Sequence, residues 1–161
     1  MENTVITKPE KISILLVDDD VNIISLLNNI FKDIYQQIHK ATSALEALEI
    51  VKNNHIDIVI SDIKMPEVDG IELVCKIKEI DEKIQCVMIT GFHDIESTMR
   101  ALHAGAFAYI NKPFNLDELI ITVSRAVEKR LNALALINKQ KELTRANEEL
   151  IKLTARQQQV L

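Results

Sequence analysis

Short apolar segments alternate five times along the chain with segments in which apolar residues recur every three or four positions. The first kind of segment is typical of buried strands and the second of amphipathic helices. Parallel strands need long crossover connections, which helices usually supply. The alternation therefore predicts an α/β fold with a five-stranded parallel sheet and helices on both faces. Predicted strands cover residues 11–17, 37–41, 56–62, 84–91 and 107–114, and predicted helices cover 21–34, 43–54, 71–80, 94–105 and the residues from about Leu116 onward.

Polar residues stand where the predicted strands end. Asp18 and Asp19 end the first strand, Asp62 ends the third, Thr90 ends the fourth, and Lys112 follows the fifth. The carboxyl ends of parallel strands share one edge of the sheet, and ligands of such sheets bind at that edge. We therefore expect these five side chains to form one site.

The three carboxylates indicate what this site binds. Two ionised carboxylates ~4 Å apart repel by roughly 4 kcal/mol at an effective dielectric constant near 20, so a cation must offset them. Asp18, Asp19 and Asp62 supply the hard oxygen ligands that Mg²⁺ prefers. The metal and Lys112 would neutralise a transferring phosphoryl group while Asp62 attacks phosphorus, and Thr90 would donate its hydroxyl to a phosphoryl oxygen.

Helix capping is the alternative for each aspartate taken singly, because an Asp at the end of a strand often only caps the next helix. Asp20 is predicted to be such a cap for the helix that begins near Val21, and Ser43 is predicted to cap the second helix. Reactive groups at four separate strand ends favour a ligand site over a set of unrelated caps.

Composition fits one compact domain with an additional element, since the chain has 161 residues of which 47% are hydrophobic. Cys75 and Cys86 form no CxxC pair, which favours free thiols in a reducing compartment. No apolar run approaches the ~18 residues that a membrane span needs, and the first residues lack the pattern of a secretory signal. These features predict a cytoplasmic protein without a membrane partner.

Four motifs carry a resemblance to the receiver domain of two-component response regulators. They are "ILLVDDD", "VISDIKMPEVDG", "MITG" and "YINKPF", and the resemblance covers about residues 10–128. It implies a flavodoxin-like (βα)5 fold with strand order 2-1-3-4-5. It also implies a cis peptide bond between Lys112 and Pro113.

The resemblance assigns roles to the residues at the strand ends. Asp62 would be the phosphoacceptor, and it would bind the metal directly together with Asp19 and the backbone carbonyl of Lys64, while Asp18 would act through water. Tyr109 would occupy the aromatic switch position of the family.

The function implied is a phosphorylation-controlled signalling switch. A histidine kinase or phosphotransfer protein would donate the phosphoryl group, and the only chemistry of the chain would be its own phosphorylation and dephosphorylation, so it would not be an enzyme. Phosphate on Asp62 would draw Thr90 inward and alter the face formed by the fourth helix, the fifth strand and the fifth helix, from about Asp94 to Val127. Lys64 and Phe92 would flank the path of attacking water and, carrying no carboxylate or amide, would leave hydrolysis slow.

A phosphatase of the haloacid-dehalogenase type is the alternative function, because "LLVDDDV" also fits the hydrophobic strand followed by DxD in that family. Asp18 would then be the nucleophile and Asp20 the general acid, which would make the chain an enzyme. That family places a further acidic pair after its fourth strand, where this chain has Thr90 and Gly91.

Charge divides the chain into two parts. Residues 1–124 carry 11 Lys or Arg and 20 Asp or Glu, a net charge of −9, whereas residues 125–161 carry 8 and 4, a net charge of +4. The negative charge disfavours DNA binding by the first part. We predict a receiver domain over residues 10–128 and a helical extension over residues 129–161.

The extension allows two interpretations. Leu136, Leu143 and Leu150 are spaced by seven, with Gln140 and Asn147 near the same seam, which predicts a dimeric coiled coil and hence a homodimer. The pattern lasts only about three heptads, so a linker helix to an output domain outside this chain, DNA-binding or other, is the alternative.

Overall fold

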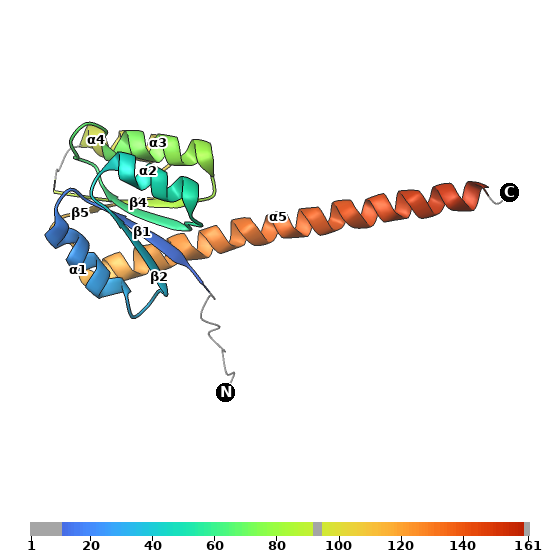
Figure 1. Cartoon of the computed structure of the whole chain (residues 1–161), viewed down its shortest axis with the longest axis horizontal. Helices are drawn as coiled ribbons and strands as arrows, with labels where there is room; N and C mark the ends of the chain where they lie inside the picture. Colours follow the sequence, from blue (N-terminus) through green and yellow to red (C-terminus); the bar gives the residue numbers. More distant parts are fainter. Residues whose placement is uncertain (1–10, 92–94, 160–161) are drawn as a thin grey trace. The chain divides into compact units, whose positions relative to one another are not determined.

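The sheet has five parallel strands in the order β2-β1-β3-β4-β5 (Figure 1). The computed structural model describes residues 11–91 and 95–159. The predicted fold class and strand order are confirmed. The strands are β1 (Ser13–Val17), β2 (Gln37–Ala41), β3 (Ile58–Asp62), β4 (Gln85–Thr90) and β5 (Ala108–Asn111).

Five helices follow the strands one by one, as the alternation predicts. They are α1 (Val21–Phe31), α2 (Ala44–Asn53), α3 (Gly70–Ile80), α4 (Ile95–His103) and α5 (Leu116–Gln159). Helix α1 ends earlier than the apolar pattern predicts, because the backbone N–H groups of Ile34 and Tyr35 both donate to the carbonyl of Phe31 and turn the chain. Ile34, the last residue of the predicted helix, therefore lies outside α1 and is 43% exposed.

Both predicted helix caps are confirmed. The side chain of Asp20 accepts from the backbone N–H of Asn22, and the hydroxyl of Ser43 accepts from the N–H of Glu46. Asp69 caps α3 in the same way by accepting from the N–H of Glu72. These side chains satisfy N–H groups that a helix leaves without partners in its first turn.

Successive strand residues point to opposite faces of the sheet, and each face has its own core. One core packs under α2, α3 and α4 and includes Leu15, Val17, Val59 and Met88. The other packs under α1 and the first turns of α5 and includes Ile14, Leu16, Ile60 and Val87. Figure 1 shows the two helical layers on either side of the sheet. Burial on both faces explains why the strands are nearly continuous apolar runs.

The two cysteines differ in environment. Cys86 lies in β4 and is buried, and this burial raises the pKa of its thiol to about 12 although the nearby Lys78 acts in the opposite direction. Cys75 lies in α3 and is exposed, and both thiols are free. The prediction of free thiols is therefore confirmed.

The chain divides into two compact units, one ending at Arg130 and the other beginning at Leu131. Within the first unit, α5 buries Leu119, Val123 and Val127, whereas Leu116 at its start is 50% exposed. Within the second unit α5 continues to Gln159, and its side chains are exposed or half-buried. No helix of the described residues is both long enough and apolar enough to cross a bilayer.

Candidate functional site

Three carboxylates meet at the carboxyl edge of the two central strands. Asp18 and Asp19 directly follow β1, and Asp62 is the last residue of the adjacent β3. One oxygen of each carboxylate lies within 4.8 Å of the others. The sequence prediction that these residues form one cluster is borne out by this geometry, because parallel pairing places the ends of β1 and β3 side by side.

Lys112 connects this cluster to the fifth strand. Its Nζ lies 3.1 Å from Oδ2 of Asp18 and 3.3 Å from Oδ2 of Asp62. Its backbone N–H donates to the carbonyl of Thr90 over 2.8 Å, and the peptide bond from Lys112 to Pro113 is cis, as the resemblance implies. The ammonium group is thus held between two carboxylates that lie 94 and 50 positions earlier in the chain.

Burial governs the electrostatics of the site. Burial raises the pKa of Asp18, which the backbone N–H of Asp20 and the ammonium of Lys112 only partly oppose. Burial alone would lower the pKa of Lys112, but the hydrogen bond to Asp18 and the charge of Asp62 outweigh it and raise that pKa. A single lysine therefore does not offset the cost of ionising Asp18 beside Asp62.

The donor set fits a hard divalent cation. Asp18 is buried, Asp62 is half-buried and Asp19 is exposed, so the cluster opens to solvent on the side of Asp19. Magnesium binds carboxylate oxygens and keeps part of its water shell, which a solvent-open set of three carboxylates permits. The net negative charge left after pairing with Lys112 has the sign that a cation requires.

The backbone of Lys64 lies beside the proposed phosphoacceptor, because its N–H donates to Oδ1 of Asp62 over 3.3 Å. Thr90 ends β4 and is buried, with its backbone paired to the strand that leads to Lys112. Tyr109 lies in β5 opposite Met88 and packs half-buried against the core under α3 and α4. The switching roles of Thr90 and Tyr109 stay predictions, as does metal binding by the carbonyl of Lys64. Phe92 and Asp94 lie outside the described residues.

Gly70 is a residue of the site that the sequence motifs do not single out. Its N–H donates to the carbonyl of Ile63 over 2.7 Å, so the first turn of α3 lies directly on the loop after Asp62. A Cβ at this position would overlap the carbonyl oxygen of Asp62 and would lie 2.9 Å from the Cα of Ile63. The pairing of a capping Asp69 with a glycine at the first helical position is the signal that could have pointed to this close approach.

Fold and site together define a doubly wound α/β domain with an acidic cluster and a lysine at the carboxyl edge of its sheet. The family model described as "Response regulator receiver domain" matches residues 14–124. The chain belongs to the response regulator receiver domain family. It is accordingly a phosphorylation-dependent signalling switch, and the resemblance seen in the sequence motifs is confirmed.

Relatives and solved structures agree with this family. The chain is 36% identical over 115 residues to the regulatory protein AtoC of Escherichia coli, covering 71% of this chain and 25% of AtoC. It is 34% identical over 119 residues to sporulation initiation phosphotransferase F of Bacillus subtilis, covering 74% of this chain and 96% of the relative. A CheY-like response regulator receiver domain protein from Methanospirillum hungatei aligns with a TM-score of 0.73 at 29% identity, covering 76% of this chain and 98% of that one.

These comparisons give no support to the alternative hypothesis of a haloacid-dehalogenase-like phosphatase. The matching family model and the relatives reported above are all of the response regulator kind. The "LLVDDDV" motif that raised the alternative covers the end of β1, the loop after it and the first residue of α1, and it lies within the residues that the receiver family model matches. The acidic pair that follows a hydrophobic strand therefore did not discriminate between the two families.

Proposed function

We propose that the chain accepts a phosphoryl group on Asp62, with Mg²⁺ held by Asp18, Asp19 and Asp62, from a histidine kinase or a phosphotransfer protein. The observation that carries this proposal is the position of Lys112, whose ammonium lies within 3.3 Å of a carboxylate oxygen of both Asp18 and Asp62. Asp62 is half-buried, and its carboxylate accepts hydrogen bonds from both the ammonium of Lys112 and the backbone N–H of Lys64.

The chemistry follows from these contacts. A carboxylate oxygen of Asp62 attacks phosphorus, a new P–O bond forms, and the bond from phosphorus to the donor nitrogen or oxygen breaks with its electron pair leaving on the donor. Lys112 places a positive charge where charge develops on the phosphoryl oxygens. Bound Mg²⁺ would supply further charge neutralisation at the same oxygens. The chain itself performs only this transfer and the later hydrolysis of its own acyl phosphate.

Mixing the full chain with acetyl phosphate and Mg²⁺ tests the proposal directly. We expect intact mass spectrometry to show the addition of one phosphoryl group, and no addition when EDTA removes the metal. Acetyl phosphate replaces the kinase in this experiment, so the identity of the natural donor does not affect the result. A chain that stays unmodified under both conditions would contradict the proposal.

Magnesium alone is expected to stabilise the fold. A ligand that binds only the native state, present at a concentration ten times its dissociation constant, raises the free energy of unfolding by about 1.4 kcal/mol. We expect thermal unfolding to show this gain for the wild type and to lose it for Asp19→Asn. Asp20→Asn is the matched control, because Asp20 caps α1 beside the cluster without belonging to it and Asn caps equally well. Equal stabilisation of all three chains would place the metal elsewhere.

Lys112 is proposed to couple phosphorylation to the signalling face, formed here by α4, β5 and the first turns of α5. The side chain of Lys112 is hydrogen-bonded to the acidic cluster, and its backbone is hydrogen-bonded to the end of β4. Loss of the side chain would therefore disconnect the phosphoryl site from β5. Thr90 and Tyr109 would complete the response by moving toward the phosphate and into the vacated space. The face already exposes apolar side chains, since Ile95 is 82% and Met99 49% exposed.

We expect Lys112→Ala to retain some phosphoryl incorporation but to lose the conformational response. Hydrogen exchange of α4 and β5 with and without beryllofluoride, which stands in for the phosphoryl group, measures that response. A charge-assisted hydrogen bond contributes about 1.5–3 kcal/mol, so we expect the phosphate-dependent change in exchange to fall about tenfold or more. Lys40→Ala removes an exposed cation from β2 and serves as control. A full response in Lys112→Ala would refute the coupling role.

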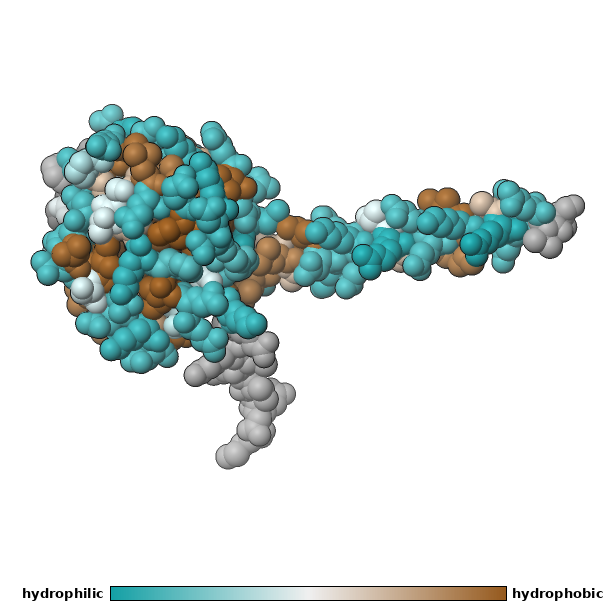
Figure 2. Space-filling model, viewed as in Figure 1, coloured by the Kyte–Doolittle hydropathy of each residue, from teal (hydrophilic) through white to brown (hydrophobic). Residues whose placement is uncertain are grey.

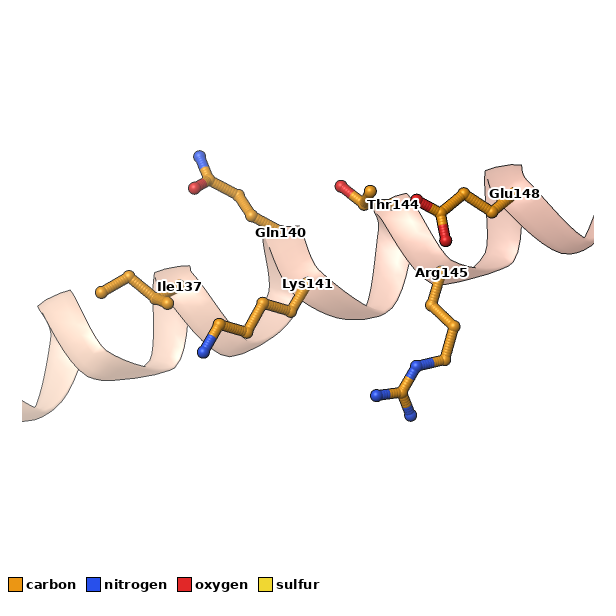
Figure 3. A pocket seen from close by; sticks show the side chains of 6 residues that line it. All are labelled: Ile137, Gln140, Lys141, Thr144, Arg145 and Glu148. Carbon is orange, nitrogen blue, oxygen red and sulfur yellow. The ribbon is translucent and has the colours of Figure 1, made fainter.

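The second unit is proposed to self-associate as a coiled coil. Leu136, Leu143 and Leu150 are 59%, 63% and 60% exposed, and Figure 2 shows apolar side chains interrupting the hydrophilic surface of the extension. Figure 3 shows the six side chains that line a shallow pocket here, and all of them come from this one helix. They are Ile137, Gln140, Lys141, Thr144, Arg145 and Glu148. Of these residues only Gln140 belongs to the predicted seam, so the coiled-coil proposal rests on the three exposed leucines rather than on this pocket.

Phosphorylation is expected to strengthen this self-association, because the extension raises the effective concentration of two receivers whose signalling faces meet. We expect sedimentation at tens of micromolar to show about tenfold tighter dimers with beryllofluoride, within the usual range of coupling free energies. A chain truncated after Arg130 and the variant Leu143→Lys should both weaken the dimer. If the full chain stays monomeric in both states, the linker-helix interpretation replaces the coiled coil.

The output of the switch belongs to the proposal as well. The chain spans about a quarter of AtoC but nearly the whole of sporulation initiation phosphotransferase F, so its relatives differ in what accompanies the receiver. In the linker-helix interpretation, which is the alternative to the coiled coil, the extension would connect the receiver to an output domain, DNA-binding or other.

A further inference from the structure

A second cluster of charged residues lies at the opposite edge of the sheet from Asp62. Asp57 directly precedes β3, and its carboxylate accepts from the backbone N–H of Ser13 at the start of β1. The Nε of Arg130 donates to Oδ1 of Asp57 over 3.0 Å, and the Nη1 of Arg130 donates to Oδ2 of Asp81 over 2.9 Å. Arg130 comes from α5 and Asp81 follows the end of α3, so three elements meet at one guanidinium.

Burial requires the charged groups of this cluster to be paired. Arg130 and Asp57 are each 2% exposed, and a buried charge is tolerated only when it is paired and hydrogen-bonded. Burial opposes ionisation of Asp81, but the N–H of Lys83 and the guanidinium of Arg130 outweigh it and lower the pKa of Asp81. His55, 65% exposed, adds a further nitrogen 3.0 Å from Asp57. Among the described residues, no buried side-chain nitrogen or oxygen lacks a partner.

The planar guanidinium of Arg130 forms hydrogen bonds in two directions. Two nitrogens of one rigid fork reach carboxylates that belong to different elements. Lysine carries one compact ammonium on a flexible stem and does not reproduce two divergent bonds of this kind. The cluster therefore selects arginine for its geometry as well as for its charge.

Arg130 lies at the boundary between the two units, within α5. It is the last residue of the first unit, and α5 continues through Leu131 without a break to Gln159. Side chains beyond Arg130 are exposed or half-buried, so packing within the single chain contributes little to holding that stretch helical. Starting a helix is costly because several residues must be fixed before the first hydrogen bond forms, whereas adding turns to an existing helix is not.

We propose that Arg130 is an anchoring residue: it fixes the last receiver turn of α5 to the amino edge of β1 and β3 and thereby starts the helix of the extension from an immobilised turn. The anchor rests on the same two strands whose other ends carry Asp18 and Asp62, and none of its partners belongs to α4 or β5. This inference does not depend on which carboxylate accepts the phosphoryl group.

Hydrogen exchange on the full chain, without any phosphoryl donor, tests the anchor. Breaking a buried pair is strongly destabilising locally, so we expect Arg130→Lys to speed exchange in residues 127–145 by about tenfold while β1 and β3 change by less than about twofold. Arg125→Met removes an exposed arginine one turn earlier in α5 and should change neither region. Exchange in the extension that matches the wild type, or that rises equally in both variants, would overturn the proposal.

A double-mutant cycle separates anchoring from general destabilisation. Asp81 has a side chain 34% exposed, so Asp81→Ala removes one bond of the fork while the fold is retained. We expect this change alone to speed exchange of the extension several-fold, and to add nothing in the Arg130→Met background, because residues of one network are not additive. Effects that add fully would show that the two residues act independently and would overturn the anchor.

Discussion

Asp62→Asn is expected to abolish the incorporation of phosphate that acetyl phosphate and Mg²⁺ produce in the wild-type chain. Asparagine keeps the shape of the side chain but loses the anionic oxygen that attacks phosphorus, so the loss should be complete rather than partial. The amide also weakens the cation site, because one of the three carboxylates is replaced. Intact mass measured over a time course reports both the extent and the rate.

Two controls separate the nucleophile from the ligand. Asp20→Asn alters a neighbouring carboxylate that caps α1 and should keep incorporation within a few-fold of the wild type, since Asn and Asp cap equally well. Reduction of the wild-type acyl phosphate with borohydride converts the modified aspartate to homoserine, and peptide mapping then locates it. We expect homoserine at position 62. Homoserine at position 18 or 19, or undiminished labelling of Asp62→Asn, would refute the assignment.

Gly70→Ala is expected to destabilise the fold more than the same substitution at either of the other two glycines. The new Cβ would overlap the carbonyl oxygen of Asp62 and approach the Cε of Met88 to 2.8 Å, and two of its three nearest neighbours are backbone atoms that cannot rotate away. Overpacking of this kind costs about 3 kcal/mol at the upper end of its usual range. For a domain of this size, thermal unfolding should shift downward by about 10 °C.

Gly91→Ala is the matched control for Gly70→Ala. Gly91 also follows the end of a central strand, but a Cβ there meets no atom of the described residues within 4 Å. Its unfolding temperature should therefore stay close to that of the wild type. Because the displaced contact in Gly70→Ala belongs to Asp62, we also expect slower phosphorylation in that variant alone. Similar unfolding temperatures for the two variants would mean that α3 shifts easily away from the loop after β3.

The strand ends were predictable because both signals involved are local. An apolar run followed by Asp predicts where a strand stops, and parallel pairing then places Asp18 and Asp62 together. The order of the strands was not available from periodicity, because five similar β-α units permit several arrangements. That order came from the family resemblance, whereas Lys112 was placed at the same edge of the sheet by its position after the fifth predicted strand.

The cluster of Arg130, Asp57 and Asp81 was not predictable by the same reasoning. A charged residue at the end of a helix or before a strand is usually solvated, and Arg130 looked like part of the basic tail. Its burial depends on how closely α5 packs on the sheet, which is a property of the assembled layers. Gly70 was missed for a related reason, since a glycine in a turn gives no indication of which backbone atom lies against it.

The contrast between the two thiols makes the native chain suitable for labelling at one site. A thiol must ionise to react with maleimide or iodoacetamide reagents, and Cys86 is both inaccessible and held protonated at neutral pH by its raised pKa. Cys75 on the surface of α3 is left as the position for a fluorophore or a spin label, with no engineered cysteine and with Cys75→Ser as the unlabelled reference. A probe there lies in the layer of α2, α3 and α4, on the other face of the sheet from α1 and the first turns of α5. Distances between two such probes would report how two receivers approach each other in solution.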